Sequence, residues 1–188
     1  MFGPKKLGSV SISISRARGP TVGFNWEGSH QPTDSELIDV TLLYFGRLIT
    51  NLTRSLEADK LISFAGYART VYEKPDEISS FLPRRNPGLE GDTRLTLVSK
   101  GSMPGILVSF SGGDPAAVGV ECFHVLVDYL YENLPLNLRL AMFASLGLIA
   151  RYYREGGRRG VGSELQAYAF VLEQFSLAQA KASQVVPE

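Results

Sequence analysis

A glycine-rich loop near the C-terminus, flanked by arginines and tyrosines, has the residue types best suited to binding chemistry. The loop spans Gly156 to Gly162, and the Ser163 and Gln166 that follow form a capping-box pattern that predicts a helix N-terminus. Backbone amides at such an end can hold an anion, and arginine with tyrosine suits phosphate contact and base stacking. The candidate anion or nucleic-acid binding residues are Arg151, Arg154, Arg158 and Arg159, with Arg84 and Arg85 in a second basic segment.

The context of this loop limits the kinds of site it can form. It contains no Gly-Lys-Ser/Thr sequence, so it is not a phosphate-binding loop of the Walker A type. It follows a predicted helix and not a strand, which is the wrong setting for a dinucleotide fingerprint. Arginines near a helix C-terminus also complement the helix dipole. A structural role and an anion-binding role therefore both stay open.

Cys122 and His124 are the residues with the most obvious catalytic chemistry, because a thiol and an imidazole can form a nucleophile and its base. Two positions apart on a helix, however, their side chains point about 200° apart. The pattern favours a buried thiol and a partly buried ring. His30 lies in a predicted loop, and one cysteine with two histidines matches no recognised zinc spacing. We therefore predict no catalytic residue, no metal site and no cofactor.

Acidic residues cluster near the starts of two predicted helices, where carboxylates complement the helix dipole. A paired-carboxylate enzyme would need a distinctive spacing that this cluster lacks. The acidic residues further along each helix fit a solvent-exposed helix face. The residues are Asp34, Glu36, Asp39, Asp114, Glu121, Asp128 and Glu132.

An internal repeat is the strongest organising feature of the chain. Between Ile38 and Glu73, eight of thirty-six positions are identical to the residue 82 positions later, where about two matches are expected from ordinary composition. The matching residues of the first copy are Leu48, Asn51, Leu52, Leu56, Ser63, Ala68, Arg69 and Glu73. The repeat predicts a duplicated architecture and does not by itself identify a reaction.

Each half of the chain has the same order of predicted elements. Apolar residues alternate with polar ones in two strands of the first half, from Val10 to Ile14 and from Val22 to Trp26, which predicts a hairpin with one apolar face. Thr33 and Glu36 form a capping box that opens a helix. A second helix is predicted over residues 61–72, and Pro75 ends it.

The second half repeats this order. Strands are predicted around Leu95 and Leu97 and from Ile106 to Phe110. Asp114 is a suitable N-cap and Pro115 suits the first helical position. Pro135 separates this helix from the next, which spans residues 136–153 and is apolar nearly all round. Such a helix belongs at the centre of the structure or in an interface.

These elements predict an α+β fold of internally duplicated β-hairpin–helix–helix units. The two hairpins form a four-stranded antiparallel sheet with helices on one face, and an extra C-terminal helix follows. The first repeat covers residues 1–73, a connector 74–93, the second repeat 94–156, and the glycine-rich loop with the last helix 157–188. All four segments form one domain with a pseudo-twofold axis.

Composition narrows the functional classes. Nineteen basic and nineteen acidic residues cancel, so nucleic acid would need a local basic patch. The most apolar run, residues 140–150, is too short to span a membrane. Without an apolar segment after Lys5 and Lys6, we expect no secretory signal and a cytoplasmic location.

We expect a non-enzymatic protein-interaction or assembly module that self-associates or binds a protein partner. The alternatives are a nucleic-acid or phosphate-ligand binder and an enzyme with a site between the repeats.

Overall fold

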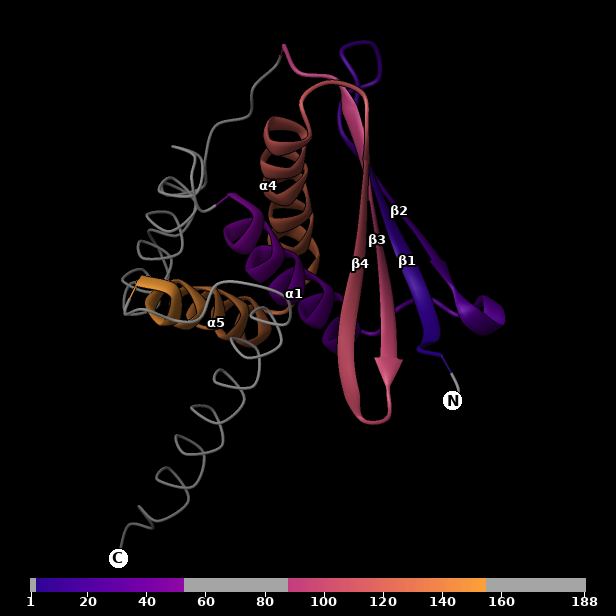
Figure 1. Ribbon diagram of the computed structural model, residues 1–188, viewed down its shortest axis with the longest axis vertical. Coiled ribbons are helices and arrows are strands. Elements are labelled where there is room, and N and C mark those ends of the chain that lie inside the picture. Colours follow the sequence, from indigo (N-terminus) through magenta and orange to yellow (C-terminus); the bar gives the residue numbers. More distant parts are fainter. Residues whose placement is uncertain (1–2, 53–87, 155–188) are drawn as a thin grey trace, which may run out of the picture.

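The computed structural model of the 188-residue chain describes residues 3–52 and 88–154. The described residues form an α+β fold in which α1, α4 and α5 stack on one face of a four-stranded antiparallel sheet (Figure 1). The predicted helix at residues 61–72, the glycine-rich loop and the C-terminal helix lie outside the described residues.

Two hairpins build the sheet, in the order β2-β1-β3-β4. The first joins β1 (Lys5–Ile14) to β2 (Thr21–Trp26), and the second joins β3 (Gly91–Lys100) to β4 (Met103–Ser111). The central strands β1 and β3 pair antiparallel, with Val10 opposite Leu95. The predicted four-stranded antiparallel sheet is confirmed. β3 begins at Gly91, inside the predicted connector 74–93, because the start of the strand pairs with the end of β1 instead of forming a loop.

β1 also begins earlier than its sequence pattern indicates, at Lys5. Its alternation is broken by a register shift between Lys6 and Gly8 in the pairing with β3. Gly8 lies opposite Trp26, and a Cβ atom at Gly8 would lie only 2.2 Å from the indole ring. The glycine therefore lets the buried tryptophan lie across the strand.

Helix α1 (Asp34–Leu52) begins at the predicted capping box. The Thr33 amide donates to Glu36 Oε2 at 2.8 Å, and the Glu36 amide donates to Thr33 Oγ1 at 3.2 Å. Burial raises the pKa of Glu36, but hydrogen bonds from Thr33 and Trp26, together with the charge of His30, hold the pKa below its ordinary value. The cap is thus formed with an ionised carboxylate.

The middle of α1 is buried on all sides, which the predicted single apolar stripe did not anticipate. Residues 40–46 are all buried. The reason is that α1 contacts the sheet and α4 on one side and α5 on the other side. The Tyr44 hydroxyl donates to the Gly119 carbonyl at 2.6 Å, which links α1 to α4. Gly119 permits the close approach of α1, since a Cβ atom there would lie 3.0 Å from the Leu48 side chain.

Helix α4 (Pro115–Asn133) packs against the sheet, and α5 (Leu136–Arg154) packs on α1, farther from the sheet (Figure 1). Asp114 caps α4 by accepting from the Ala117 amide at 2.9 Å, and the chain turns at Pro135 as its sequence predicts. The guanidinium of Arg139 donates to the Tyr131 carbonyl at 3.1 Å and lies over the Tyr131 ring. This contact fixes the corner between the two helices.

Helix α5 is less buried than its apolar sequence suggests. Met142 and Leu146 face the core, while Leu136, at the start of α5, is 52% exposed. The centre of the described core is instead formed by α1 and α4, where Phe45 stacks on Phe123 with ring centroids 5.2 Å apart. An apolar sequence alone could not distinguish a central helix from one with an exposed face.

Candidate functional site

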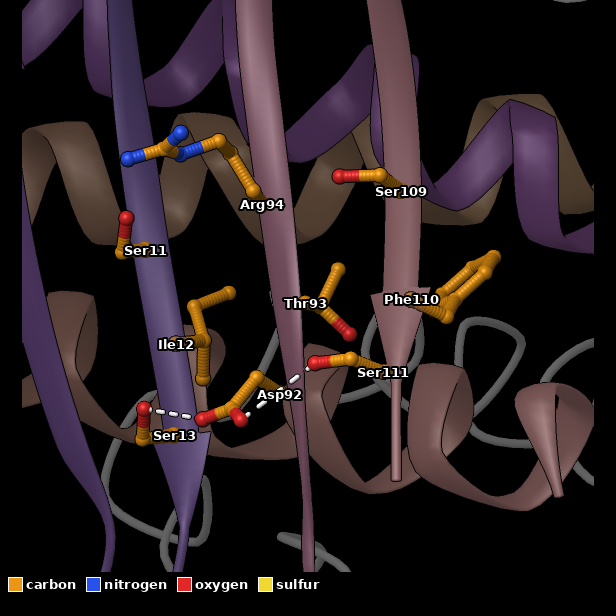
Figure 2. Close-up of a pocket in the computed structure, with 9 residues that line it drawn as sticks. All are labelled: Ser11, Ile12, Ser13, Asp92, Thr93, Arg94, Ser109, Phe110 and Ser111. Atoms are coloured by element: carbon orange, nitrogen blue, oxygen red, sulfur yellow. Dashed lines mark hydrogen bonds between the residues drawn. The ribbon is translucent and has the colours of Figure 1, made fainter. Parts of the chain in front are cut away.

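Two rows of polar side chains cross the face of the sheet that carries no described helix. Side chains on adjacent strands form a row when their residues are paired and point to the same face. The first row is Ser13, Asp92 and Ser111, and the second row is Ser11, Arg94 and Ser109. We call these six residues the polar rows. They come from both hairpins, and the boundary between β1 and β3 runs through them (Figure 2).

Asp92 holds the first row together. Its Oδ1 accepts a hydrogen bond from the Ser13 hydroxyl, and its Oδ2 accepts one from the Ser111 hydroxyl at 3.4 Å (Figure 2). A serine hydroxyl has one hydrogen to donate, so donation to Asp92 leaves the outward lone pairs of both serines as acceptors. The first row therefore presents fixed acceptors.

The second row supplies the complementary groups. Arg94 extends its guanidinium toward β1, above Ser11 (Figure 2). A guanidinium is a donor only and keeps its charge at all physiological pH values. A row of acceptors thus lies next to a row containing a permanent cation. Such a surface can bind a partner that presents donors beside an anion or a carbonyl.

The polar rows lie beside two adjoining hollows. One, of about 360 Å³, is bounded by the polar rows, and the other, of about 630 Å³, continues past Ser13 and Asp92 toward the hairpin turn that contains Arg18. Gly112 and Gly113 border the second hollow with φ angles of +74° and +66°. Only glycine adopts these angles without strain, so this part of the wall is backbone.

Arg16 anchors the edge of the second hollow. Its amide donates to Glu90 Oε1 at 3.1 Å, and its guanidinium donates to the Gly88 carbonyl at 2.7 Å. Gly91 follows, and a Cβ atom there would lie 2.7 Å from the Val118 side chain and 2.8 Å from the Gly112 carbonyl. The turn of the first hairpin is therefore tied to the segment that enters β3.

Neither hollow is lined by a histidine or a cysteine. Ser13 and Ser111 therefore have a carboxylate beside them but no imidazole among the lining residues to act as base. The chemistry that this arrangement supports directly is recognition by hydrogen bonds and charge. In the described part of the chain, no group of three or more His, Cys, Asp or Glu side chains could hold a metal ion.

Cys122 lies on the helix-covered side of the sheet and is fully buried, as predicted. Its Sγ lies 3.8 Å from the Ile12 carbonyl. Burial raises the pKa of Cys122 to about 11, while Thr93 lowers it in part. Thr93 Oγ1 is itself buried and lacks a well-formed hydrogen bond within the described residues, but it lies close enough to affect the thiol. His124 is partly buried, with its ring 6.0 Å from that of Phe123.

The candidate arginines of the sequence are not brought together within the described residues. Arg151 and Arg154 lie in the last turn of α5, and their side-chain positions are not described. Arg84, Arg85, Arg158 and Arg159 fall outside residues 3–52 and 88–154. The predicted anion or nucleic-acid site therefore stays a prediction.

The polar rows were missed at the level of sequence. The alternating serines of β1 mark a polar face, and that signal was visible. Asp92 lies 79 residues after Ser13, however, and no local pattern links them. Only the pairing of β1 with β3 places these two side chains together.

Comparison with known proteins adds no further constraint on the site. No helix in the described ranges has the length and apolar character needed to cross a membrane. A scan against protein-family models and searches of curated proteins and of solved structures found no match to this chain.

Proposed function

We propose that this protein is a non-enzymatic protein-interaction or assembly module that self-associates or binds a protein partner. The observation that carries this proposal is the exposed sheet face, where Asp92 fixes two serine hydroxyls beside Arg94. Orienting groups before binding lowers the entropy lost on association. Small serine side chains also lose little rotamer entropy on contact. The face therefore suits a flat polar partner surface.

The duplication remains part of this proposal, and the strand pairing supports it. Val10 pairs with Phe24 in the first hairpin, and Leu95 pairs with Val108 in the second. Val10 and Leu95 also pair with each other between the hairpins. A twofold axis between these two residues would exchange the hairpins, with a difference of one residue in loop length. The helical part of the first repeat lies largely outside the described residues.

Binding and sedimentation measurements test the proposed function. The full chain is sedimented over a range of concentrations, and partners are captured from lysate and identified. Asp92→Ala should weaken the association, since it removes the group that orients Ser13 and Ser111. Glu132→Ala, an exposed carboxylate on α4, is the matched control and should leave it unchanged. A strictly monomeric chain that captures no partner contradicts the proposal.

Nucleic-acid or phosphate binding is a second candidate. Arg151 and Arg154 both belong to the last turn of α5, and Arg158 and Arg159 follow within five residues of its end. Phosphate contacts make affinity fall steeply with salt. Single-stranded oligonucleotides should therefore bind at low salt and dissociate on salt addition, and Arg158→Ala/Arg159→Ala should weaken this binding. Absence of binding at low salt rules out this candidate.

An enzyme with its site between the repeats is the third candidate. Ser13 and Asp92 come from different hairpins and meet beside the two hollows, which is where such a site would lie. Asp92→Asn keeps the shape of the side chain while removing its charge. If a reaction is found and Asp92→Asn leaves its rate unchanged, the hollows are not its site.

A further inference from the structure

The two edge strands of the sheet differ in how open they are to another strand. Natural proteins shorten exposed edges or place charges on them, because an open edge is a template for pairing. β2 has six residues and leads directly into the short helical turn η1 (Glu27–Ser29). β4 has nine residues, none of them charged, and within the described sheet it has only β3 as a neighbour. Neither edge strand carries a charge, so length distinguishes them: among the described residues, β4 is the longer open edge.

Leu107 is the central residue of β4 and is 56% exposed. Its side chain points away from the helices, between the smaller Gly105 and Ser109. A single exposed leucine is common on protein surfaces, but Leu107 lies on an edge strand, where a second strand would bring an apolar side chain opposite it. Because Leu107 lies at the midpoint of the strand, it can meet Leu107 of a second copy directly across a twofold axis.

We propose that β4 pairs antiparallel with β4 of a second copy of this chain, with the twofold axis at Leu107. This inference rests on the proposed function as an assembly module and adds a second contact surface, the β4 edge, to the polar rows. The two sheets would join into one continuous sheet, and Leu107 would lie opposite Leu107 of the second copy. A twofold contact of this kind uses the same surface on both subunits and closes at the dimer.

The backbone of β4 favours this register. A proline is tolerated in a sheet where its nitrogen faces an open edge, so the nitrogen of Pro104 faces away from β3. Because the direction of the backbone amides alternates along a strand, the amides of Ile106, Val108 and Phe110 face the same open edge. In the dimer, Ile106 and Val108 exchange hydrogen bonds with Val108 and Ile106 of the second copy. Leu107 then occupies a pair without backbone hydrogen bonds, in which opposite side chains are closest.

Charge also favours a second copy as the occupant. No residue of β4 from Met103 to Ser111 carries a charge. Pairing with its own copy therefore brings no like charges face to face along the strand, a repulsion that would otherwise oppose a self-complementary contact. Strand pairing of this length gives an interface at the small end of the range, so the dimer dissociates on dilution.

Sedimentation of two matched variants tests the dimer. Leu107→Lys places like charges face to face on the twofold axis and should weaken dimerisation by about tenfold or more. Leu136→Lys is the control, because Leu136 is similarly exposed but lies on α5. Unchanged dimerisation of Leu107→Lys, or an equal loss in both variants, overturns the β4 contact. Circular dichroism of each variant checks that the fold is kept.

A disulfide provides a second and independent measurement. Leu107→Cys should form a covalent dimer under mild oxidation, because paired residues without backbone hydrogen bonds lie closest. Cys122 is the only native cysteine and is buried, so it does not interfere. Leu136→Cys should give no such dimer, and equal cross-linking in both variants overturns the proposal. A wild-type chain that stays monomeric but captures another protein contradicts only the β4 dimer, whereas a monomer that captures nothing contradicts the proposed function as well.

Discussion

The two faces of the sheet have different physical roles. On the helix-covered face, Val10, Ile12 and Leu95 are fully buried against α4 and its neighbours. On the opposite face, hydroxyls, one carboxylate and one guanidinium lie in rows. The covered face is stabilised by removing apolar surface from water, whereas the open face gains little stability from exposed polar contacts. Substitutions on the two faces should therefore separate stability from binding.

The largest change in the free energy of unfolding is expected in β3, where neighbouring residues point to opposite faces of the sheet. Leu95→Ala removes a fully buried side chain and should lower the free energy of unfolding by about 2–5 kcal/mol. Arg94→Ala, one position earlier on the exposed face, should change it by no more than about 0.5 kcal/mol. Urea denaturation of both variants measures the difference, and equal effects would contradict the assignment of the faces.

The second-largest loss of stability is expected at the contact between Gly8 and Trp26. Gly8→Ala introduces a Cβ atom 2.2 Å from the indole ring, so the ring must move, at a cost of about 1–3 kcal/mol. Trp26 is the only tryptophan and is buried, so its emission should shift to longer wavelength in the variant. Gly23→Ala is the control, since a Cβ atom there meets nothing within 4 Å. An unchanged emission spectrum in Gly8→Ala would show that the ring does not lie over this glycine.

Alkaline pH tests the burial of Cys122 on the covered face. Burial raises the pKa of Cys122 from 9.0 to about 11, so between these values the native state keeps a proton that the unfolded state has lost. Stability then falls as pH rises, by about 2 kcal/mol at pH 11. Cys122→Ala should lose less stability than the wild type between pH 9 and pH 11. Parallel pH curves would mean that the thiol is not buried in this way.

The smallest effect is expected on the open face. Ser13→Ala removes a hydrogen bond to Asp92 and should cost about 0.5–1 kcal/mol. Ser109→Ala, in the neighbouring row, should cost less than about 0.5 kcal/mol. Thermal unfolding of the pair measures the contribution of the Asp92 contact. A large loss on Ser13→Ala would mean that the open face supports folding and is not reserved for binding.

Local patterns were sufficient for several features of this protein. The capping pair of Thr33 and Glu36, the start of α4 at Asp114 and the break at Pro135 were all predicted and are all present. Each of these depends on interactions between residues close in sequence, which a short window contains.

The sequence by itself determined the alternating strands, the helix starts and the antiparallel class of the sheet. Only the tertiary structure decided that Asp92 lies between Ser13 and Ser111, that the middle of α1 is buried on all sides, and that β4 is an edge of the described sheet. The reason is physical: periodicity shows which side of an element is apolar, but its neighbours depend on pairing and packing between residues far apart in the chain. A hydroxyl and a carboxylate separated by 79 positions have no common local signal, and they meet because β1 and β3 bury their apolar faces in one register.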